Sequence, residues 1–302
     1  MSAQVGVVHV SSRPALPKAL AAGLRGLTRS RAATFGSIVL GLTVLAATFA
    51  PLLAPRAYDA QDFSVALLPP LASAGHPLGT DQFGRDIWSR ILYGARISLA
   101  VSLCGMIIAA LVGVSAGLLS AYFGGLLDAA IMRVADVQLS FPYLILAIAM
   151  MALLGQSLPL LVVVLAVRGW VNYARTIRGV VLSLKEEEFV TAAVVAGASP
   201  HRIILRHLLP NVMAPIIVLS SFEMAAMMLI EASLSFLGLG VQPPVPSWGS
   251  MISQGREYIY THWWMPTLPG VALMLAVLGA NQLGDGLRDL LDPWLRGRSS
   301  VP

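Results

Sequence analysis

Long runs of apolar residues, almost free of charge, recur along this chain of 302 residues. A helix needs roughly 20 apolar residues to cross the hydrocarbon core of a bilayer, about 30 Å thick, and several runs reach that length. Apolar residues make up 57% of the chain and charged residues only 12%, with a mean hydropathy of +0.76. A water-soluble domain does not have this composition, so the sequence predicts a polytopic membrane protein.

The apolar runs are continuous, whereas the strands of a membrane barrel alternate between apolar and polar residues. Helices also satisfy their own backbone hydrogen bonds in lipid. We therefore predict an all-α membrane protein with six transmembrane helices. Residues 123–142 are expected to turn the chain before the third span, which ends near residue 154. The other five spans are expected at residues 34–54, 97–121, 159–180, 212–237 and 265–283.

One face of the second predicted span consists of small residues at intervals of four, namely Ala109, Gly113, Gly117 and Ala121. Small side chains allow two helix backbones to approach closely in a membrane. We predict that this face packs against another helix.

Basic residues set the orientation of the chain, because short cytoplasmic loops are enriched in Lys and Arg. Five basic residues and no acidic residue precede the first span: Arg13, Lys18, Arg25, Arg29 and Arg31. An uncleaved anchor fits this long basic lead and long apolar run better than a signal peptide does. With six spans, both termini are predicted to be cytoplasmic, together with the basic residues Arg175, Arg178, Lys185, Arg202, Arg206, Arg288, Arg296 and Arg298.

Several chemistries have no sequence support. The P-loop of an ATPase requires a Lys followed by Ser or Thr, but Lys18 precedes Ala19 and Lys185 precedes Glu186. The histidines are too scattered to suggest a metal site, and no catalytic constellation is legible. The basic residues flank apolar spans, which favours the bilayer over nucleic acid as their partner.

A charged, helix-forming segment at residues 186–211, "EEEFVTAAVVAGASPHRIILRHLLPN", separates the fourth and fifth spans. Small and apolar residues at helical spacing form one face: Phe189, Ala192, Ala193, Ala196 and Gly197. Ser199 and Pro200 are suited to the N-cap and first position of a second short helix. We predict either a compact cytoplasmic pair of helices that docks a partner or an interfacial helix on the lipid headgroups.

This segment resembles the EAA signature of permease subunits of ATP-binding-cassette importers, which runs Glu-Ala-Ala, three residues, Gly, nine residues, Ile-x-Leu-Pro. Ala192, Ala193, Gly197, Leu209 and Pro210 match in register. Thr191 stands at the Glu position and His207 at the Ile position. In that family the segment is the coupling helix, which inserts into a groove of the ATPase subunit.

Three further stretches are similar to the C-type permease subunit of dipeptide, oligopeptide and nickel importers: residues 76–99, 231–252 and 284–293. The resemblance covers the chain from the first span onward, and the stretch through Ser30 carries no recognisable motif. It implies the type I importer permease (MetI-like) fold. The implied organisation is a cytoplasmic basic tail at 1–33 and a permease domain at 34–302, with external segments at 55–96 and 238–264 and a coupling loop at 185–210.

The resemblance also implies a non-catalytic subunit of the bacterial cytoplasmic (inner) membrane. Its partners would be a homologous B-type permease, two ATPase domains and an external solute-binding protein. ATP and Mg would be bound by the ATPase subunits, and this chain would bind no cofactor or metal of its own. The residues expected to contact the ATPase are Ala192, Ala193, Gly197, Ser199, Pro200 and His201, although His201 is equally consistent with a solvated loop histidine.

Ionisable residues inside the predicted spans are the second candidate site, because charge in a membrane is costly and faces a partner or water. Arg168 lies in the fourth span, and Glu223 and Glu231 lie in the fifth. Arg168 and Glu223 are expected at similar depths, which allows an ion pair. Glu223 could instead line the translocation path or bond to a neighbouring helix, and Glu231 could fix helix packing.

The Pro- and Trp-rich external segment at 242–264 suggests a docking surface for a binding protein, with Trp263 and Trp264 expected to anchor at the membrane interface. A self-sufficient secondary transporter remains a rival class, but no inverted repeat is visible. A membrane enzyme is the other rival. Within the importer class, peptides are the expected cargo, with nickel or glutathione as alternatives.

Overall fold

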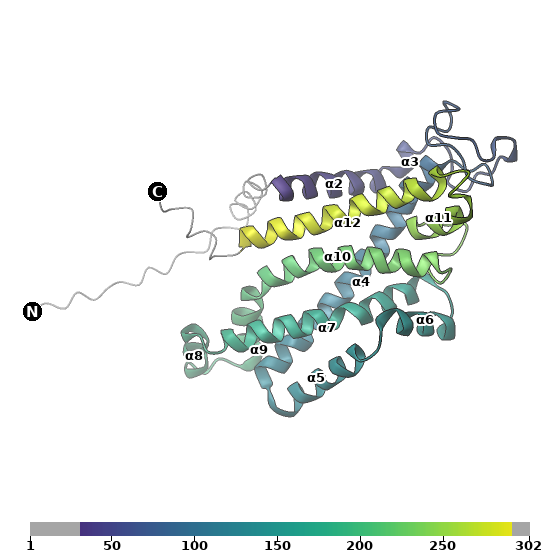
Figure 1. Cartoon of the computed structure of the whole chain (residues 1–302). Helices are drawn as coiled ribbons and strands as arrows, with labels where there is room; N and C mark the ends of the chain where they lie inside the picture. Colours follow the sequence, from purple (N-terminus) through teal and green to yellow (C-terminus); the bar gives the residue numbers. More distant parts are fainter. Residues whose placement is uncertain (1–30, 292–302) are drawn as a thin grey trace, which may run out of the picture.

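The protein is a bundle of long helices, seen in a computed structural model that describes residues 31–291 (Figure 1). Most of the predicted 1–33 tail, along with Arg296 and Arg298, lies outside the described residues. Five described helices are long and apolar enough to cross a membrane: α2 (Arg31–Thr48), α4 (Ile87–Phe123), α7 (Leu158–Leu184), α10 (Met213–Phe236) and α12 (Trp264–Leu291). These spans confirm the prediction of an all-α membrane protein.

The remaining span, which is the third along the chain, differs from its prediction. It is a pair of helices, α5 (Gly125–Leu139) and α6 (Tyr143–Leu154), bent by 88° at the break between them. Residues 123–142 were expected to turn the chain. The chain does turn at Gly124, where φ is +65°, but most of the remaining residues form α5, and a second bend follows at Ser140–Pro142. Proline has no backbone N–H to donate and disfavours a helical residue before it, which accounts for the break at Pro142.

Two helices extend well beyond their predicted spans. α4 contains 37 residues, about 55 Å at 1.5 Å per residue, and begins ten residues before the predicted start at Ile97. Asp86 accounts for this early start, because its carboxylate accepts a hydrogen bond from the backbone N–H of Ser89 at 2.7 Å and caps the helix. α12 continues to Leu291 through a polar segment that was predicted to follow the span.

α4 and α7 pack through the predicted small-residue face. A Cβ atom at Gly113 would lie 2.3 Å from the carbonyl oxygen of Trp170, and one at Gly117 would lie 2.6 Å from the carbonyl oxygen of Ala174. Backbone therefore meets backbone along this contact, and only glycine fits. The predicted packing role of this face is confirmed.

The two ends of the bundle carry different structures. α3 (Ala50–Leu53), η1 (Phe63–Val65), α11 (Trp248–Gly255) and η4 (Arg256–Tyr258) lie with the loop 54–86 at one end, and α8 (Glu188–Val195) lies at the other (Figure 1). We call these the α11 end and the α8 end. α4 runs from one to the other.

A buried polar cluster joins the loops at the α11 end. The Nε of Arg85 lies 2.6 Å from Asp81 Oδ2, and the Nε of Arg90 lies 3.7 Å from the same oxygen. Gln254 Oε1 in α11 accepts from Arg85 at 2.9 Å and from Arg90 at 3.1 Å. Two distant segments are thus fixed to each other by charged hydrogen bonds.

Trp263 and Trp264, predicted together as membrane anchors, differ in their exposure. Trp263 is 54% exposed, but Trp264 is 6% exposed and its Nε1 donates to the carbonyl oxygen of Thr80 at 3.3 Å. The prediction of a membrane anchor is therefore wrong for Trp264, which packs with Ile87 and Met265 at the α11 end.

Replacing Gly113 with Ala should lower the free energy of unfolding by about 1–3 kcal/mol, the usual range for overpacking. The added methyl group would meet the carbonyl of Trp170 and force α4 away from α7. Thermal unfolding in mild detergent would measure the loss. Gly179→Ala is the control, because a Cβ atom at this α7 position meets nothing within 4 Å. Equal stability of the two variants would contradict the close-packing account.

Candidate functional site

The segment after α7 forms a helical hairpin whose base is tied to α4. Lys185 directly follows α7, and its Nζ donates to the carbonyl oxygens of Ala121 and Tyr122 at 2.9 Å each. These carbonyls belong to the last turn of α4, where no backbone donor follows within the helix. A cation at a helix C-terminus also interacts favourably with the helix dipole.

The hairpin consists of α8 (Glu188–Val195), α9 (Pro200–Ile203), the π-helical turn η2 (Ile204–Leu208) and the short helix η3 (Leu209–Asn211). Its inner side is buried in the main hydrophobic core. The buried residues on this side are Val190, Ile203, Ile204 and Leu208. This apolar packing holds the hairpin to the bundle as one body.

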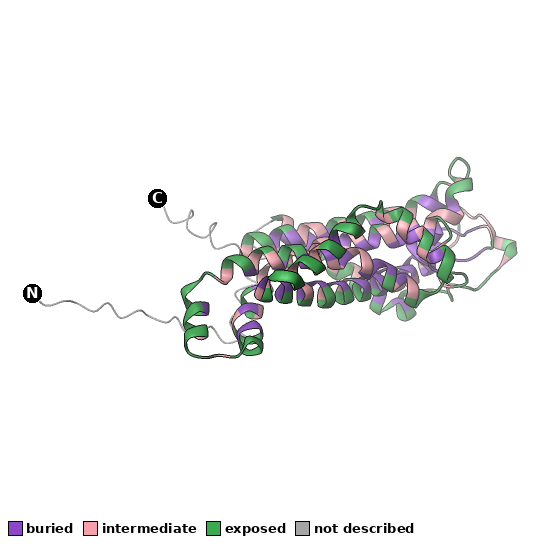
Figure 2. Cartoon of the chain, turned by 90° about the horizontal axis from the view of Figure 1, so that it is seen from below, coloured by how far each residue is buried: buried purple, intermediate pink, exposed green. Residues whose placement is uncertain are grey.

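The outer side of the hairpin is exposed, as Figure 2 shows at the end of the bundle. Of the six predicted contact residues, Ala193 is half-buried and the other five are exposed: Ala192, Gly197, Ser199, Pro200 and His201. Val194 and Val195 add apolar surface, with 54% and 83% of their area exposed. A surface that combines small and apolar residues in this way is typical of a protein contact.

Two local details differ from the expected helix pattern. α8 ends at Val195, so Gly197 lies in the turn after the helix, where its φ of +76° favours glycine. Ser199 occupies the N-cap position of α9 as predicted, with Pro200 following, but its side chain makes no capping hydrogen bond.

The two departures from the EAA pattern have local contacts. The Thr191 hydroxyl donates to the carbonyl oxygen of Glu187, one turn back, at 3.4 Å. The His207 ring lies 6.5 Å from the ring of Phe189, centroid to centroid. The shorter Thr side chain is therefore directed along its own helix, and His207 packs within the hairpin.

The intramembrane charges of α7 and α10 form an ion pair. Arg168 Nη1 lies 2.7 Å from Glu223 Oε2, and Asn172 Nδ2 donates to Glu223 Oε1 at 2.6 Å. The Glu223 side chain is 5% exposed, whereas that of Arg168 is 25% exposed. The structure thus forms the pair that the sequence allowed, and the path-lining role of either residue stays a prediction.

Glu231 has a different environment from Glu223. It is fully buried, and its carboxylate accepts hydrogen bonds from Ser98 at 2.8 Å and Ser235 at 2.7 Å. Ser98 lies on α4, so Glu231 joins α10 to α4. This position agrees with the packing role considered for Glu231.

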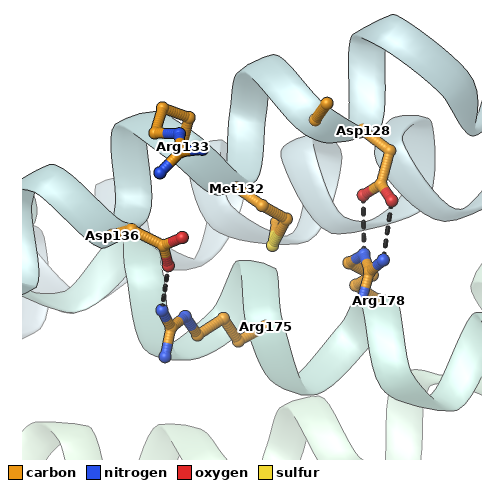
Figure 3. Close-up of a pocket in the computed structure, with 7 residues that line it drawn as sticks. Asp128, Met132, Arg133, Asp136, Arg175 and Arg178 are labelled. Atoms are coloured by element: carbon orange, nitrogen blue, oxygen red, sulfur yellow. Dashed lines mark hydrogen bonds and ion pairs between the residues drawn. The ribbon is translucent and has the colours of Figure 1, made fainter.

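A second group of charges was not predicted as a site. Arg178 forms a bidentate pair with Asp128, and Arg175 pairs with Asp136, so α7 and α5 are bridged twice (Figure 3). These pairs border a hollow of about 530 Å³. Arg175 and Arg178 were interpreted from the sequence only as orientation signals, although their spacing from Arg168 and Asn172 places all four near one side of α7.

The comparisons with known proteins agree with this architecture. The family described as the binding-protein-dependent transport system inner membrane component matches residues 109–297. The chain belongs to this family. It is a permease component of a transport system and a multi-pass protein of the inner membrane, with the MetI-like fold expected from the sequence.

A second family, the N-terminal transmembrane domain of oligopeptide transport permease C, matches residues 21–70 of the permease. This match includes the last ten residues of the stretch through Ser30, which was thought to carry no motif. The C-type character predicted from the sequence is therefore confirmed.

Three relatives cover most of the permease. A dipeptide transport system permease protein of Alkalihalophilus pseudofirmus is 43% identical over 89% of this chain and 88% of its own length. A di/tripeptide transport system permease protein of Pseudomonas aeruginosa is 39% identical over 95% and 96%. An oligopeptide transport system permease protein of Haemophilus influenzae is 38% identical over 89% and 86%.

Removing the cation of the intramembrane pair should destabilise the permease. Arg168→Met leaves Glu223 buried without its charge partner, at an expected cost of about 3 kcal/mol. Adding Glu223→Gln should recover part of this loss, because a neutral amide needs no counter-charge. Both variants would be compared by thermal unfolding in detergent.

Arg175→Met is the matched control for this experiment. Its pair with Asp136 is about half exposed, with 48% and 51% of the two side chains accessible. An exposed pair contributes under about 1 kcal/mol. An Arg168→Met variant as stable as the control would show that the pair does not support the fold.

Proposed function

We propose that this chain is the C-type permease subunit of an ATP-driven importer of dipeptides and oligopeptides. The names of the relatives support a peptide cargo: three proteins about 40% identical over most of their length are named as dipeptide, di/tripeptide or oligopeptide transport permeases. A solute-binding protein would deliver the peptide outside, and a homologous B-type permease would form the path together with this chain.

The α8 hairpin supports the proposed coupling to ATPase subunits. Its outer side is exposed and carries small residues, whereas its inner side is buried. Its base is hydrogen-bonded to α4 through Lys185. A force on the outer side would therefore act on α4, α7 and α10 together. Closure of an ATPase dimer would shift the hairpin as a rigid body, and packed interfaces respond to such shifts by switching between discrete states.

The proposed orientation places the α8 end in the cytoplasm with both termini. Arg31, Lys185, Arg202 and Arg206 lie at or near this end, as expected for the cytoplasmic side. The α11 end, with its buried polar cluster, would then receive the binding protein. ATP and Mg would be held by the ATPase subunits alone.

The main test of coupling places a large side chain on the exposed surface of α8. Ala192→Trp should abolish co-purification of the ATPase subunits with the C-terminally tagged permease, because the indole ring would fill the space needed for close docking. Ala192 is exposed and helical, so the change introduces no backbone strain, unlike a substitution at Gly197. Subunits would be identified by mass spectrometry after extraction in mild detergent.

Leu42→Trp is the control for this experiment, because Leu42 is 61% exposed on the apolar helix α2, far from the hairpin in sequence. This variant should retain the ATPase subunits. Retention by both variants, with each protein folded, would remove the hairpin from the proposed ATPase contact.

Transport by the reconstituted complex tests the cargo. Liposomes containing both permeases and both ATPase domains should accumulate a radiolabelled dipeptide only with ATP and the binding protein present. Nickel and glutathione are the controls, and ATP-driven uptake of either one without dipeptide uptake would select an alternative cargo. Transport by this chain alone without ATP would instead identify a secondary transporter.

A further inference from the structure

Polar residues form a continuous stripe along α7. Arg168, Asn172, Arg175 and Arg178 follow one another at intervals of four, three and three residues, which keeps them near one side of a helix. Their acidic partners come from two helices: Glu223 of α10 for the first two, and Asp136 and Asp128 of α5 for the others. The stripe leads from the intramembrane pair toward the α8 end.

The half of this stripe nearer the α8 end, Arg175 and Arg178, borders the hollow between α5 and α7. Its volume of about 530 Å³ falls in the range of pockets that hold small ligands. Figure 3 shows the carboxylates of Asp128 and Asp136 directed toward α7, with Met132 projecting between the two ion pairs. Arg133 also lines the hollow, and it forms no ion pair within residues 31–291.

The two ion pairs differ in how readily their side chains can exchange partners with a ligand. Arg178 bonds Asp128 through two nitrogens, at 2.6 Å each, and its side chain is 33% exposed. The Arg175–Asp136 pair is single and about half exposed on both sides. A bidentate pair is geometrically fixed, whereas an exposed single pair readily exchanges its partner for water or another charge.

α5 is held over the hollow mainly by polar contacts. Of its fifteen residues only Ala135 is buried. Besides the two ion pairs, Gln138 Nε2 donates to the carbonyl oxygen of Val167, and Gln138 Oε1 accepts from Trp170 at 2.7 Å. Charges inside a membrane segment require water or a polar ligand beside them. The hollow is therefore suited to a polar occupant and poorly suited to lipid tails.

We propose that this hollow is a binding site for the zwitterionic backbone of a short peptide during its passage. The peptide carboxylate would bond to Arg133 and Arg175, and its ammonium group would bond to Asp136, while Arg178 and Asp128 form the fixed wall. Because the three arginines and two aspartates nearly balance, the site holds both termini without a strong net field. The inference rests on the proposed function, since it concerns the same peptide cargo.

Photocrosslinking within the complete reconstituted complex tests the site directly. p-Benzoylphenylalanine at position 132 replaces the Met side chain that projects between the ion pairs and leaves all five charges intact. During ATP-driven uptake it should label radiolabelled alanyl-phenylalanine. The same group at Val134, which is 59% exposed on α5 and does not line the hollow, should not label the dipeptide.

A charge substitution gives the second measurement. Arg133→Gln should lower dipeptide uptake about tenfold, the loss expected for one charge-assisted hydrogen bond. Thermal stability should remain unchanged, because Arg133 forms no ion pair within residues 31–291. Arg133→Lys should retain most of the uptake.

The outcomes separate this inference from the proposed function. Dipeptide uptake by the wild-type complex, with position 132 labelling only lipid or the other permease, would overturn the site and leave the peptide importer intact. Unchanged uptake by Arg133→Gln would also overturn it. Absence of dipeptide uptake by the wild-type complex would overturn the proposed cargo and the site together.

Discussion

The contact between α4 and α7 is the constraint on which the rest of the bundle depends. At Gly113 and Gly117 the α7 carbonyl groups approach so closely that no side chain fits between the helices. Since lipid tails are as apolar as a leucine side chain, burial alone does not drive helices together in a membrane, and close packing must supply the attraction. The small residues of α4 provide that packing over about three turns and hold α7 in a fixed register.

Bonds at both ends make α4 the rod to which other segments are attached. At the α11 end Asp86 caps the helix, and Arg90 shares the Gln254 amide of α11 with Arg85. At the α8 end its last carbonyls accept from Lys185, directly before the hairpin. The loops at the α11 end and the α8 hairpin are therefore fixed to opposite ends of one helix, and α4 connects them directly.

Much of this arrangement could be predicted from the sequence, because the signals were local. The interval of four between Ala109 and Gly113 gave the packing face, and the spacing of Gly197 and Pro210 located the hairpin. Helix α5 was missed because residues 123–142, which include Asp128 and Asp136, were expected to turn the chain before the third span. Those carboxylates are explained only by their partners on α7, more than 35 residues away in the sequence, and no local pattern identifies such a pairing. The burial of Trp264 was missed for the same reason, since its hydrogen-bond acceptor is Thr80.

The two glutamates of α10 show how position determines the use of a buried charge. They lie eight residues apart, near one side of the helix, yet Glu231 contacts serine hydroxyls and Glu223 contacts a guanidinium group and an amide. Neutral donors around a fully buried carboxylate fix the packing of α10 on α4, and nothing in that contact can exchange with solvent. Arg168, by contrast, retains exposed area beside the polar stripe of α7. If the cargo is a peptide, the charges able to exchange partners with it lie on the α7 side of the bundle, whereas those on the α4 side maintain the structure.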